Sequence, residues 1–394
     1  MDKKLTIGLF TDNFFPAIGG TEMVVHQLAT ALTKLGHNVY VVAPYVHAKK
    51  FDANLPYNVI RFEALHVYWN TYAGMPAISF KAKKQIKNID FDIINTHSNA
   101  IFLRLGIKVA KQKNIPVVSN VHTNFREVYK QVWFLRPFTK CLLKRLAKSL
   151  NKSNKIITIC KGMIKDMKTW PCKTEEINII RNATEYSKNN NYGLLRKEGQ
   201  KILHLSQKDF MLLFVGRLEK YKNIQFTLEA LSKIKNKSDF KYVIVGDGEY
   251  LLNLKNLVKK YDLESNVIFF GKADHKTLEK IYARADILTL TNVFDNNSLT
   301  ILESATFKTP TIVLEGSSSS EEIVDKQNGF CVCEDANKYA EYLSQIKSSK
   351  ELLEKVSSSA KETLSRNWED VAKQYLKVYL NAIEDYNTNK KRSD

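Results

Sequence analysis

Short apolar runs alternate along the first half of the chain with longer segments in which apolar residues recur at helical spacing. Between the first two runs, a segment that ends near Leu35 places Val25, Leu28 and Leu32 on one face. Alternating strands and helices predict a doubly wound parallel sheet, which binds ligands beyond the carboxyl ends of its strands. The predicted strands are Leu5–Phe10, Asn38–Ala43, Phe91–Asn95, Ile115–Asn120, Lys155–Cys160 and Ile177–Arg181.

The same alternation begins again in the second half, which predicts a second α/β domain. Its predicted strands are Met211–Val215, Tyr242–Val245, Asn266–Phe270, Asp286–Leu290 and Thr311–Leu314. Residues 187–208 are polar and lack clear periodicity, so we expect a linker between an N-terminal domain of residues 1–186 and a second domain of residues 209–367. A helical pattern covers residues 368–386, and the tail 387–394 is expected to be disordered.

Length and composition agree with two cytosolic domains. The 394 residues, 44% of them hydrophobic, are enough for two cores of ordinary size. No apolar run approaches the roughly 18 residues of a membrane span, and the first residues lack the apolar region of a signal peptide. The five cysteines are scattered, so we expect reduced thiols in a cytosolic protein.

The net charge of +19 lies mainly in the first half: residues 1–186 hold 28 Lys and Arg against 12 Asp and Glu. Such a field indicates an anionic partner, although a Lys-rich surface also serves solubility. Within Asn124–Lys155, aromatic and basic residues alternate in a way that favours the surface of an anionic bilayer. A basic helix packed on its own domain and a single-stranded nucleic acid site are the alternatives. The candidate membrane residues are Lys130, Trp133, Phe134, Arg136, Lys140, Lys144, Arg145 and Lys148.

The stretch Phe294–Pro310 reads as a polar loop followed by a helix, with Asp295 in the loop and Glu303 in the helix. Ser298 and the two Asn residues before it can cap a helix that begins near Leu299, whose free N–H groups favour an anion. Two carboxylates beside an anion site suit a ligand with an anionic middle and hydroxyl groups at both ends. A nucleotide sugar has this chemistry.

Basic residues and histidines follow several of the predicted strands. Arg217 and Lys222 come between a strand and a helix, where they can bind a diphosphate or lie in a solvated loop. Gly246-Asp247-Gly248 has Leu251 where a dinucleotide fingerprint needs a third Gly, so an oxidoreductase is weakly supported.

In the first half, Gly19 and Gly20 allow close approach to a phosphate or sugar, or simply a tight turn into a helix. His97 and His122 sit at strand carboxyl ends, where a doubly wound sheet keeps its site. His122 is the stronger candidate for a functional residue.

These segments together resemble the retaining glycosyltransferases of the GT-B fold, a family that includes diacylglycerol glucosyltransferases. The stretch 295–310 is similar to that family's E-x7-E motif, with Asp295 in place of the first Glu. The segment Gly216–Asn223 is similar to its diphosphate-binding motif. Segments beginning at Val245, Val267 and Asn328 follow in the family's order, so the resemblance covers nearly the whole chain.

The resemblance implies two Rossmann-like domains that face a cleft, with the helix 368–386 crossing back to the first domain. In this arrangement Arg217 and Lys222 would neutralise the leaving diphosphate, Glu303 would bind the ribose, and Asp295 and His122 would contact the donor sugar. The family uses no metal and no cofactor. The implied catalytic residues are His122, Asp295, Arg217 and Lys222. The implied donor-binding residues are Gly19, Gly20, Arg217, Lys222, Asp295, Leu299, Thr300 and Glu303.

The expected reaction is retaining transfer of a hexose from a UDP-sugar such as UDP-glucose to a lipid or lipid-linked glycan, at the cytoplasmic face of the cell membrane. The expected partners are the nucleotide sugar and an anionic membrane, not a nucleic acid. Asp295 is shorter than Glu, Ser298 replaces a usual Gly, and Lys308 stands where Gly is common. These departures keep three alternatives open: a polysaccharide enzyme with a soluble acceptor, a weakly active or non-catalytic membrane-binding subunit, and an epimerase of similar fold.

Overall fold

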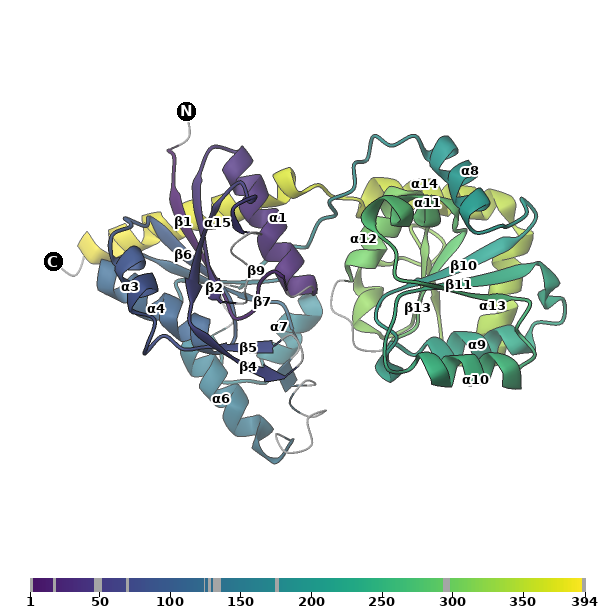
Figure 1. Cartoon of the computed structure of the whole chain (residues 1–394), viewed down its shortest axis with the longest axis horizontal. Helices are drawn as coiled ribbons and strands as arrows, with labels where there is room; N and C mark the ends of the chain where they lie inside the picture. Colours follow the sequence, from purple (N-terminus) through teal and green to yellow (C-terminus); the bar gives the residue numbers. More distant parts are fainter. Residues whose placement is uncertain are drawn as a thin grey trace. The chain divides into compact units, whose positions relative to one another are not determined.

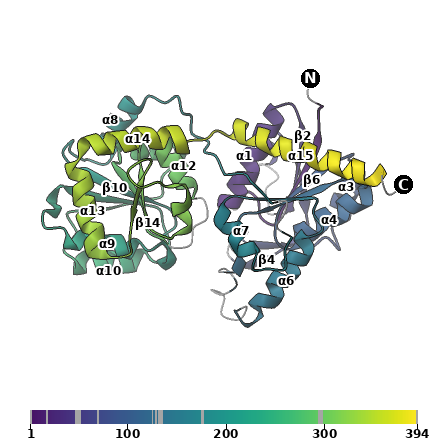
Figure 2. The ribbon, with the colours of Figure 1, turned by 180° about the vertical axis from the view of Figure 1, so that it is seen from behind.

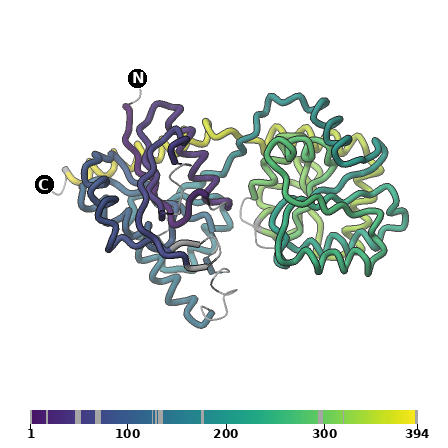
Figure 3. Tube along the Cα trace, in the orientation of Figure 1, coloured from purple at the N-terminus to yellow at the C-terminus, as the bar shows by residue number. Residues whose placement is uncertain are grey.

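The computed structural model describes residues 3–16, 19–45, 52–68, 71–123, 125–126, 129, 136–173, 177–292 and 298–391. The chain divides into two compact units (Figure 1). Unit 1 consists of Met1–Asn182 and Trp368–Asp394, and unit 2 consists of Ala183–Asn367. The Cα trace in Figure 3 leaves unit 1 near Asn182 and returns to it at Trp368.

Unit 1 is built on a parallel sheet with the strand order β3-β2-β1-β6-β7-β8-β9. The order reverses between β1 and β6, so the carboxyl ends of these two strands border the switch point of the sheet. The strands are β1 (Thr6–Thr11), β2 (Asn38–Pro44), β3 (Asn58–Phe62), β6 (Ile93–His97), β7 (Val117–Val121), β8 (Lys155–Thr158) and β9 (Ile177–Ile179). A separate antiparallel hairpin pairs β4 (Ala64–Tyr68) with β5 (Thr71–Gly74).

Helices connect these strands and cover the sheet. Leu9 and Phe10 of β1 point to opposite faces and both are buried, so apolar side chains fill both sides of the sheet. The helices are α1 (Gly20–Lys34), α3 (Phe80–Lys87), α4 (Ile101–Lys113), η1 (Arg136–Phe138), α6 (Thr139–Leu150), α7 (Lys161–Met167) and α15 (Trp368–Lys391).

The last helix, α15, belongs to unit 1 although it follows unit 2 in the sequence (Figure 2). Val371, Tyr375, Tyr379 and Ala382 recur on one face and are all buried, as their spacing predicts. The helix continues through Lys391, beyond residue 386, into part of the segment for which disorder is expected from the sequence.

Unit 2 repeats the design with a parallel sheet in the order β12-β11-β10-β13-β14-β15, which reverses between β10 and β13. The strands are β10 (Phe210–Val215), β11 (Phe240–Val245), β12 (Val267–Gly271), β13 (Ile287–Leu290), β14 (Thr311–Leu314) and β15 (Phe330–Val332). The helices are α8 (Tyr192–Ile202), η2 (Lys220–Lys222), α9 (Ile224–Lys233), η3 (Lys237–Asp239), α10 (Leu251–Lys260), α11 (His275–Arg284), α12 (Leu299–Thr306), η4 (Ser318–Glu322), α13 (Ala336–Ser348) and α14 (Lys350–Leu364).

The predicted doubly wound parallel sheet is confirmed in both units. The segment 187–208 differs from its interpretation as a linker, because it contains α8, which packs against α11. Arg196 on α8 lies 2.6 Å from the Asp286 carboxylate and donates to the carbonyl groups of Ala283 (3.1 Å) and Arg284 (3.0 Å). These contacts join α8 to unit 2, and its short apolar face gave no strong periodic signal.

Gly199 makes this helix packing possible, and its replacement by Ala should destabilise the protein. A Cβ on Gly199 would lie 2.1 Å from the backbone oxygen of Lys280 and 2.9 Å from the Cβ of Arg284, so α8 and α11 would have to separate. We expect Gly199→Ala to lower the free energy of unfolding by about 1–3 kcal/mol, measured by urea denaturation of the full chain.

The same helix supplies a matched control. A Cβ on Gly193 would meet no atom within 4 Å. Gly193→Ala should therefore be neutral or stabilising by up to about 1 kcal/mol, since Ala favours the helix over Gly. Equal effects of the two substitutions would contradict the close contact at Gly199.

Candidate functional site

The carboxyl end of β10 carries the two cations that the sequence assigns to a diphosphate. Arg217 follows Gly216 directly after the strand; its side chain is 65% exposed, and one guanidinium nitrogen lies 3.1 Å from the Glu219 carboxylate. Lys222 ends η2, with its ammonium group 5.2 Å from the centroid of the Tyr221 ring. Both cations therefore lie in the loop at the switch-point edge of the unit 2 sheet.

Two glycines bring the neighbouring loop, which follows β11, against this one. The backbone oxygen of Asp247 accepts a 3.0 Å hydrogen bond from the N–H of Leu218. A Cβ on Gly246 would lie 1.8 Å from the oxygen of Gly216, and one on Gly248 would lie 2.4 Å from that of Leu218. Close contact between two loops therefore explains the Gly-Asp-Gly sequence without a dinucleotide.

The amino terminus of α12 lies at the same edge, because α12 follows β13, the strand next to β10. Ser298 occupies the N-cap without a side-chain hydrogen bond to the helix, and its hydroxyl lies 2.8 Å from that of Thr300. Within the described residues, no group accepts a hydrogen bond from the backbone N–H of Leu299 or Thr300. Free N–H groups at a helix start attract anions. Asp295 lies outside the described residues.

Glu303 lies on the second turn of α12 and is held by a residue to which the sequence analysis gave no role. The hydroxyl of Tyr282, on α11, donates a 2.6 Å hydrogen bond to one Glu303 oxygen. Burial raises the pKa of Glu303 to about 7, an effect that the hydrogen bond from Tyr282 opposes and the nearby charge of Glu185 increases. Near neutral pH, Glu303 is thus divided between the protonated and the ionised form. Tyr282 is 21 residues away in sequence, so no local pattern links the two.

At the switch point of unit 1, the structure weakens one explanation of the glycine pair. Gly19 is the N-cap of α1 with an extended backbone (φ −161°, ψ 175°), and neither it nor Gly20 has a positive φ. A Cβ on Gly20 would meet no atom within 4 Å, and one on Gly19 would meet only the carboxylate of Glu22. A tight turn therefore does not require these glycines, and their approach to a donor stays a prediction.

A buried hydrogen-bond network lies at the carboxyl ends of β6 and β7. Nδ1 of His97, the last residue of β6, is 2.9 Å from Nε2 of His122, which follows β7. Nε2 of His97 is 2.6 Å from Oδ1 of Asn95. The same oxygen accepts hydrogen bonds from Nδ2 of Asn120 (3.1 Å) and from the hydroxyl of Tyr379 on α15 (2.8 Å). The network thus joins the C-terminal helix to His122.

This network assigns the tautomer of both histidines. The amide nitrogen of Asn95 donates to the carbonyl oxygen of Val118, which leaves Oδ1 as the acceptor. Nε2 of His97 then carries its hydrogen, Nδ1 accepts, and the hydrogen of His122 is on Nε2. Burial lowers the pKa of His122 to about 4 and also holds the pKa of His97 well below its usual range. Both rings are therefore neutral at physiological pH.

A cavity of about 230 Å³ opens beside the two histidines and is lined by residues that follow β1, β6 and β7. Asp12, in its wall, accepts three hydrogen bonds from backbone N–H groups at the start of α4: Asn99 (3.1 Å), Ala100 (3.0 Å) and Phe102 (3.0 Å). Asp12 therefore fixes this end of α4. The cavity is the polar space at the unit 1 switch point, and the sequence analysis did not identify Asp12 as part of it.

The predicted membrane surface is described only in part, because Lys130, Trp133 and Phe134 lie outside the described residues. α6 buries Leu143 and Leu146, whereas four cations on its other side are exposed. The helix is thus packed on its own unit and presents a basic face at the same time. The exposed cations are Lys140, Lys144, Arg145 and Lys148, and Arg136 precedes them in η1.

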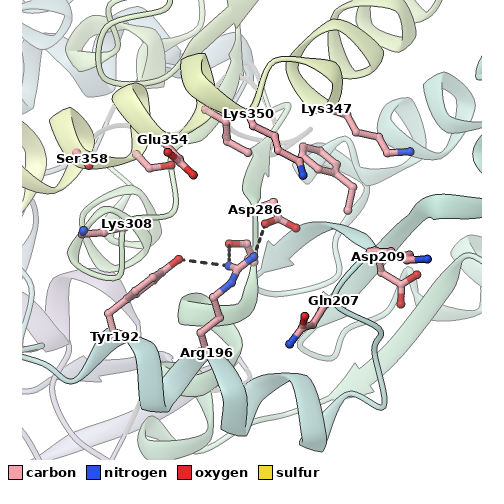
Figure 4. A pocket seen from close by; sticks show the side chains of 15 residues that line it. Tyr192, Arg196, Gln207, Asp209, Asp286, Lys308, Lys347, Lys350, Glu354 and Ser358 are labelled. Atoms are coloured by element: carbon pink, nitrogen blue, oxygen red, sulfur yellow. Dashed lines mark hydrogen bonds and ion pairs between the residues drawn. The ribbon is translucent and has the colours of Figure 1, made fainter.

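Another pocket of unit 2, of about 600 Å³, contains none of the predicted donor residues (Figure 4). It lies at the amino-terminal edge of the sheet, since Phe210 begins β10 and Asp286 precedes β13. Arg196 crosses its floor and contacts the Asp286 carboxylate. Lys308, also in its wall, has φ +58° at the position after α12 where Gly is common, with its ammonium group 5.7 Å from the centroid of the Tyr192 ring. This pocket is separate from the switch point.

Two further searches cover only the described residues. They find no helix that is both long and apolar enough to cross a bilayer. They also find no group of three or more His, Cys, Asp or Glu side chains arranged to hold a metal ion.

Similar proteins agree with this architecture. The chain is 27% identical over 334 residues to an alpha-monoglucosyldiacylglycerol synthase of Streptococcus pneumoniae, covering 82% of this chain and 74% of that protein. It is 24% identical over 392 residues to the protein of the same name from Acholeplasma laidlawii, covering 96% of each.

Solved structures share the fold at lower identity. Anabaena HepE, determined in complex with UDP, superposes with a TM-score of 0.78 at 15% identity, covering 96% of this chain and 100% of that one. A sucrose-phosphate synthase from Thermosynechococcus elongatus gives a TM-score of 0.76 at 19% identity, covering 97% and 100%. The predicted GT-B class, with two doubly wound parallel-sheet units, is confirmed.

Two family models divide the chain as the two units do. Residues 18–188 match the model described as Glycosyltransferase Family 4. Residues 196–363 match the model described as Glycosyl transferases group 1. The chain therefore belongs to the glycosyltransferases, with a family 4 domain followed by a group 1 domain.

Proposed function

We propose that the protein transfers a hexose, with retention at the anomeric carbon and without a metal, from a UDP-sugar to a lipid or glycolipid acceptor. One observation carries the donor assignment: the pairing of β10 with β13 brings Arg217, Lys222 and the start of α12 to one edge of the unit 2 sheet. This edge is the switch point, where doubly wound sheets bind ligands. Cations beside a helix amino terminus suit a diphosphate.

The proposed donor follows from this edge and from the solved relatives. Anabaena HepE binds UDP, and a second structure of it contains UDP-glucose. In the present chain Glu303 would accept hydrogen bonds from the ribose hydroxyls with the oxygen that Tyr282 does not engage. Asp295, Gly19 and Gly20 remain predicted contacts of the sugar and the phosphates.

In the reaction, the bond between the anomeric carbon and the phosphate oxygen breaks, and a bond from that carbon to the acceptor hydroxyl oxygen forms on the same face. The acceptor proton passes to the leaving phosphate oxygen. Negative charge grows on the diphosphate in the transition state, where Arg217, Lys222 and the N–H groups of α12 stabilise it more than in the ground state. His122, neutral and oriented by His97, would hydrogen-bond a sugar hydroxyl.

Two observations support a lipid acceptor at a membrane surface. Both synthases reported above are named for monoglucosyldiacylglycerol. In addition, residues 101–150 hold 11 Lys and Arg against one Asp or Glu, and the described cations of α6 face solvent. Such a surface attracts anionic lipids at about 1 kcal/mol per basic residue near the bilayer.

A thermal-shift panel tests the donor assignment directly. The full chain is heated with UDP, GDP, ADP and their glucose conjugates, and only a ligand that binds the folded protein should raise Tm. Stabilisation by uridine nucleotides alone supports the assignment. Incubation of the stabilising sugar nucleotide with diacylglycerol vesicles, followed by product analysis of the anomeric linkage, then tests acceptor and stereochemistry.

The two cations of the β10 loop should be essential for transfer. We expect Arg217→Ala and Lys222→Ala each to lower kcat/KM by a factor on the order of 10² or more, because each removes positive charge from the leaving diphosphate. Lys220→Ala, in the same loop, is the matched control and should have a much smaller effect. Near-normal turnover in both Arg217→Ala and Lys222→Ala would refute the phosphate assignment.

Glu303 should make donor binding depend on pH. With a pKa of about 7, the carboxyl group must lose its proton to accept hydrogen bonds from the ribose, so binding is penalised below pH 7 and the penalty disappears above it. UDP-glucose, whose diphosphate does not titrate in this range, should bind about tenfold more weakly at about pH 6 than at about pH 8. Calorimetry measures both affinities.

The control for this pH effect is Glu303→Gln, which retains an acceptor for Tyr282 but cannot ionise. Its affinity for UDP-glucose should not change over the same pH range. A wild-type affinity that is equally flat would show that Glu303 does not bind the ribose as a carboxylate. Tyr282 does not interfere, because burial holds its pKa well above its usual value.

A further inference from the structure

A groove of about 860 Å³ lies between α4 and α6 in unit 1, and none of the proposed reaction takes place there (Figure 1). Its floor is apolar and includes Ile107 and Ala110 of α4, with Ile115 and Val117 where β7 begins. Tyr386 of α15 closes one side. The groove is therefore a concave surface made by three helices and the start of a strand.

The rim of this groove carries only positive charge among the residues that line it. Arg104, Lys108 and Lys111 are spaced four and three residues apart on α4, so they share one side of that helix. Across the groove, Arg145 and Lys148 of α6 and Lys152 just beyond it face them. Of the described residues that line the groove, none is Asp or Glu.

These six cations lack the partners that neighbouring cations have. Lys155 lies 2.8 Å from the Asp385 carboxylate, and Arg126 lies 2.8 Å from that of Asp166. Within the described part of the chain, by contrast, none of the six rim cations forms an ion pair with a carboxylate. Like charges gathered on one groove repel each other, and an anion between them would remove that repulsion.

The groove is remote from the histidine site of the same unit. Val117, at the amino end of β7, lines the groove, whereas His122 follows the carboxyl end. Five strand residues separate the two places by roughly 15 Å. A ligand in the groove therefore does not occupy the cavity at the switch point.

We propose that this α4–α6 groove binds the phosphate group of an amphiphilic or small phosphorylated ligand. The rim cations pair with the phosphate oxygens, and the non-polar part of the ligand lies on the apolar floor. The headgroup of an anionic phospholipid and a soluble phosphate compound share this chemistry. Because all six cations are exposed, the interaction is weakened by salt.

The test removes the three α4 cations, which are not among the residues proposed for the membrane surface or the reaction. The variant is Arg104→Gln, Lys108→Gln and Lys111→Gln together. Gln has nearly the helix propensity of Lys and Arg, so α4 should stay folded and Tm unchanged. The matched control is Lys255→Gln, Lys259→Gln and Lys260→Gln on the exposed side of α10 in unit 2.

Two probes distinguish the sources of the phosphate. Sedimentation with vesicles of phosphatidylglycerol and phosphatidylcholine, compared with phosphatidylcholine alone, reports a lipid headgroup. Calorimetry with inorganic pyrophosphate reports a soluble ligand. With the probe that the wild type binds, the α4 variant should bind about tenfold or more weakly, and the α10 variant like the wild type.

Binding of either probe with this pattern supports the groove and identifies its source of phosphate. The proposal is overturned if the wild type binds neither probe, or if the α4 and α10 variants behave alike. Neither measurement requires sugar transfer, so a negative result leaves the proposed reaction standing, and failure of the proposed reaction leaves the groove standing.

Discussion

The amide oxygen of Asn95 is the interaction on which the organisation of unit 1 depends. It accepts hydrogen bonds from Tyr379 on the last helix and from Asn120 on β7, and it orients His97. A buried polar group that loses such partners costs about 1–3 kcal/mol, so these residues must all be in place for any of them to be tolerated. One consequence is that the chain must return from unit 2 before the site at His122 is complete, since Tyr379 lies in α15. The C-terminal helix is therefore part of the site's support as well as of the core.

Unit 2 uses charged contacts for the same purpose, but at the opposite edge of its sheet. Asp286, just before β13, accepts from Arg196 on α8 and from Arg284 on α11. Arg284 is almost completely buried and also donates to the backbone oxygens of Ser206 and Asp209. These bonds hold the amino-terminal edge of the sheet, which leaves the carboxyl-terminal edge, with Arg217 and the start of α12, free for ligands.

The sequence predicts the alternating elements well and the tertiary partners poorly, and the reason is physical. A buried parallel strand such as Met211–Val215 is a local apolar run, and its carboxyl end marks the place of Arg217. By contrast, α8 is stabilised by contacts made at Gly199 and Arg196, which have no periodic signature. The pairing of Tyr282 with Glu303 likewise depends on how α11 packs on α12. His97 and His122 were placed correctly after strands, but their hydrogen bond requires β6 and β7 to be neighbours.

The proposed site divides its work between exposed charge and buried neutral groups. Arg217 is on an exposed loop, where a cation keeps its hydration until a diphosphate replaces the water. His122 is neutral and Glu303 is near its midpoint at neutral pH, because burial penalises the charged form of each. Neutral or half-ionised groups suit hydroxyl partners, which carry no charge of their own. A buried carboxylate is costly without a partner and less so with two hydroxyl donors, so the energy that Glu303 costs the free protein is partly recovered when a sugar nucleotide binds.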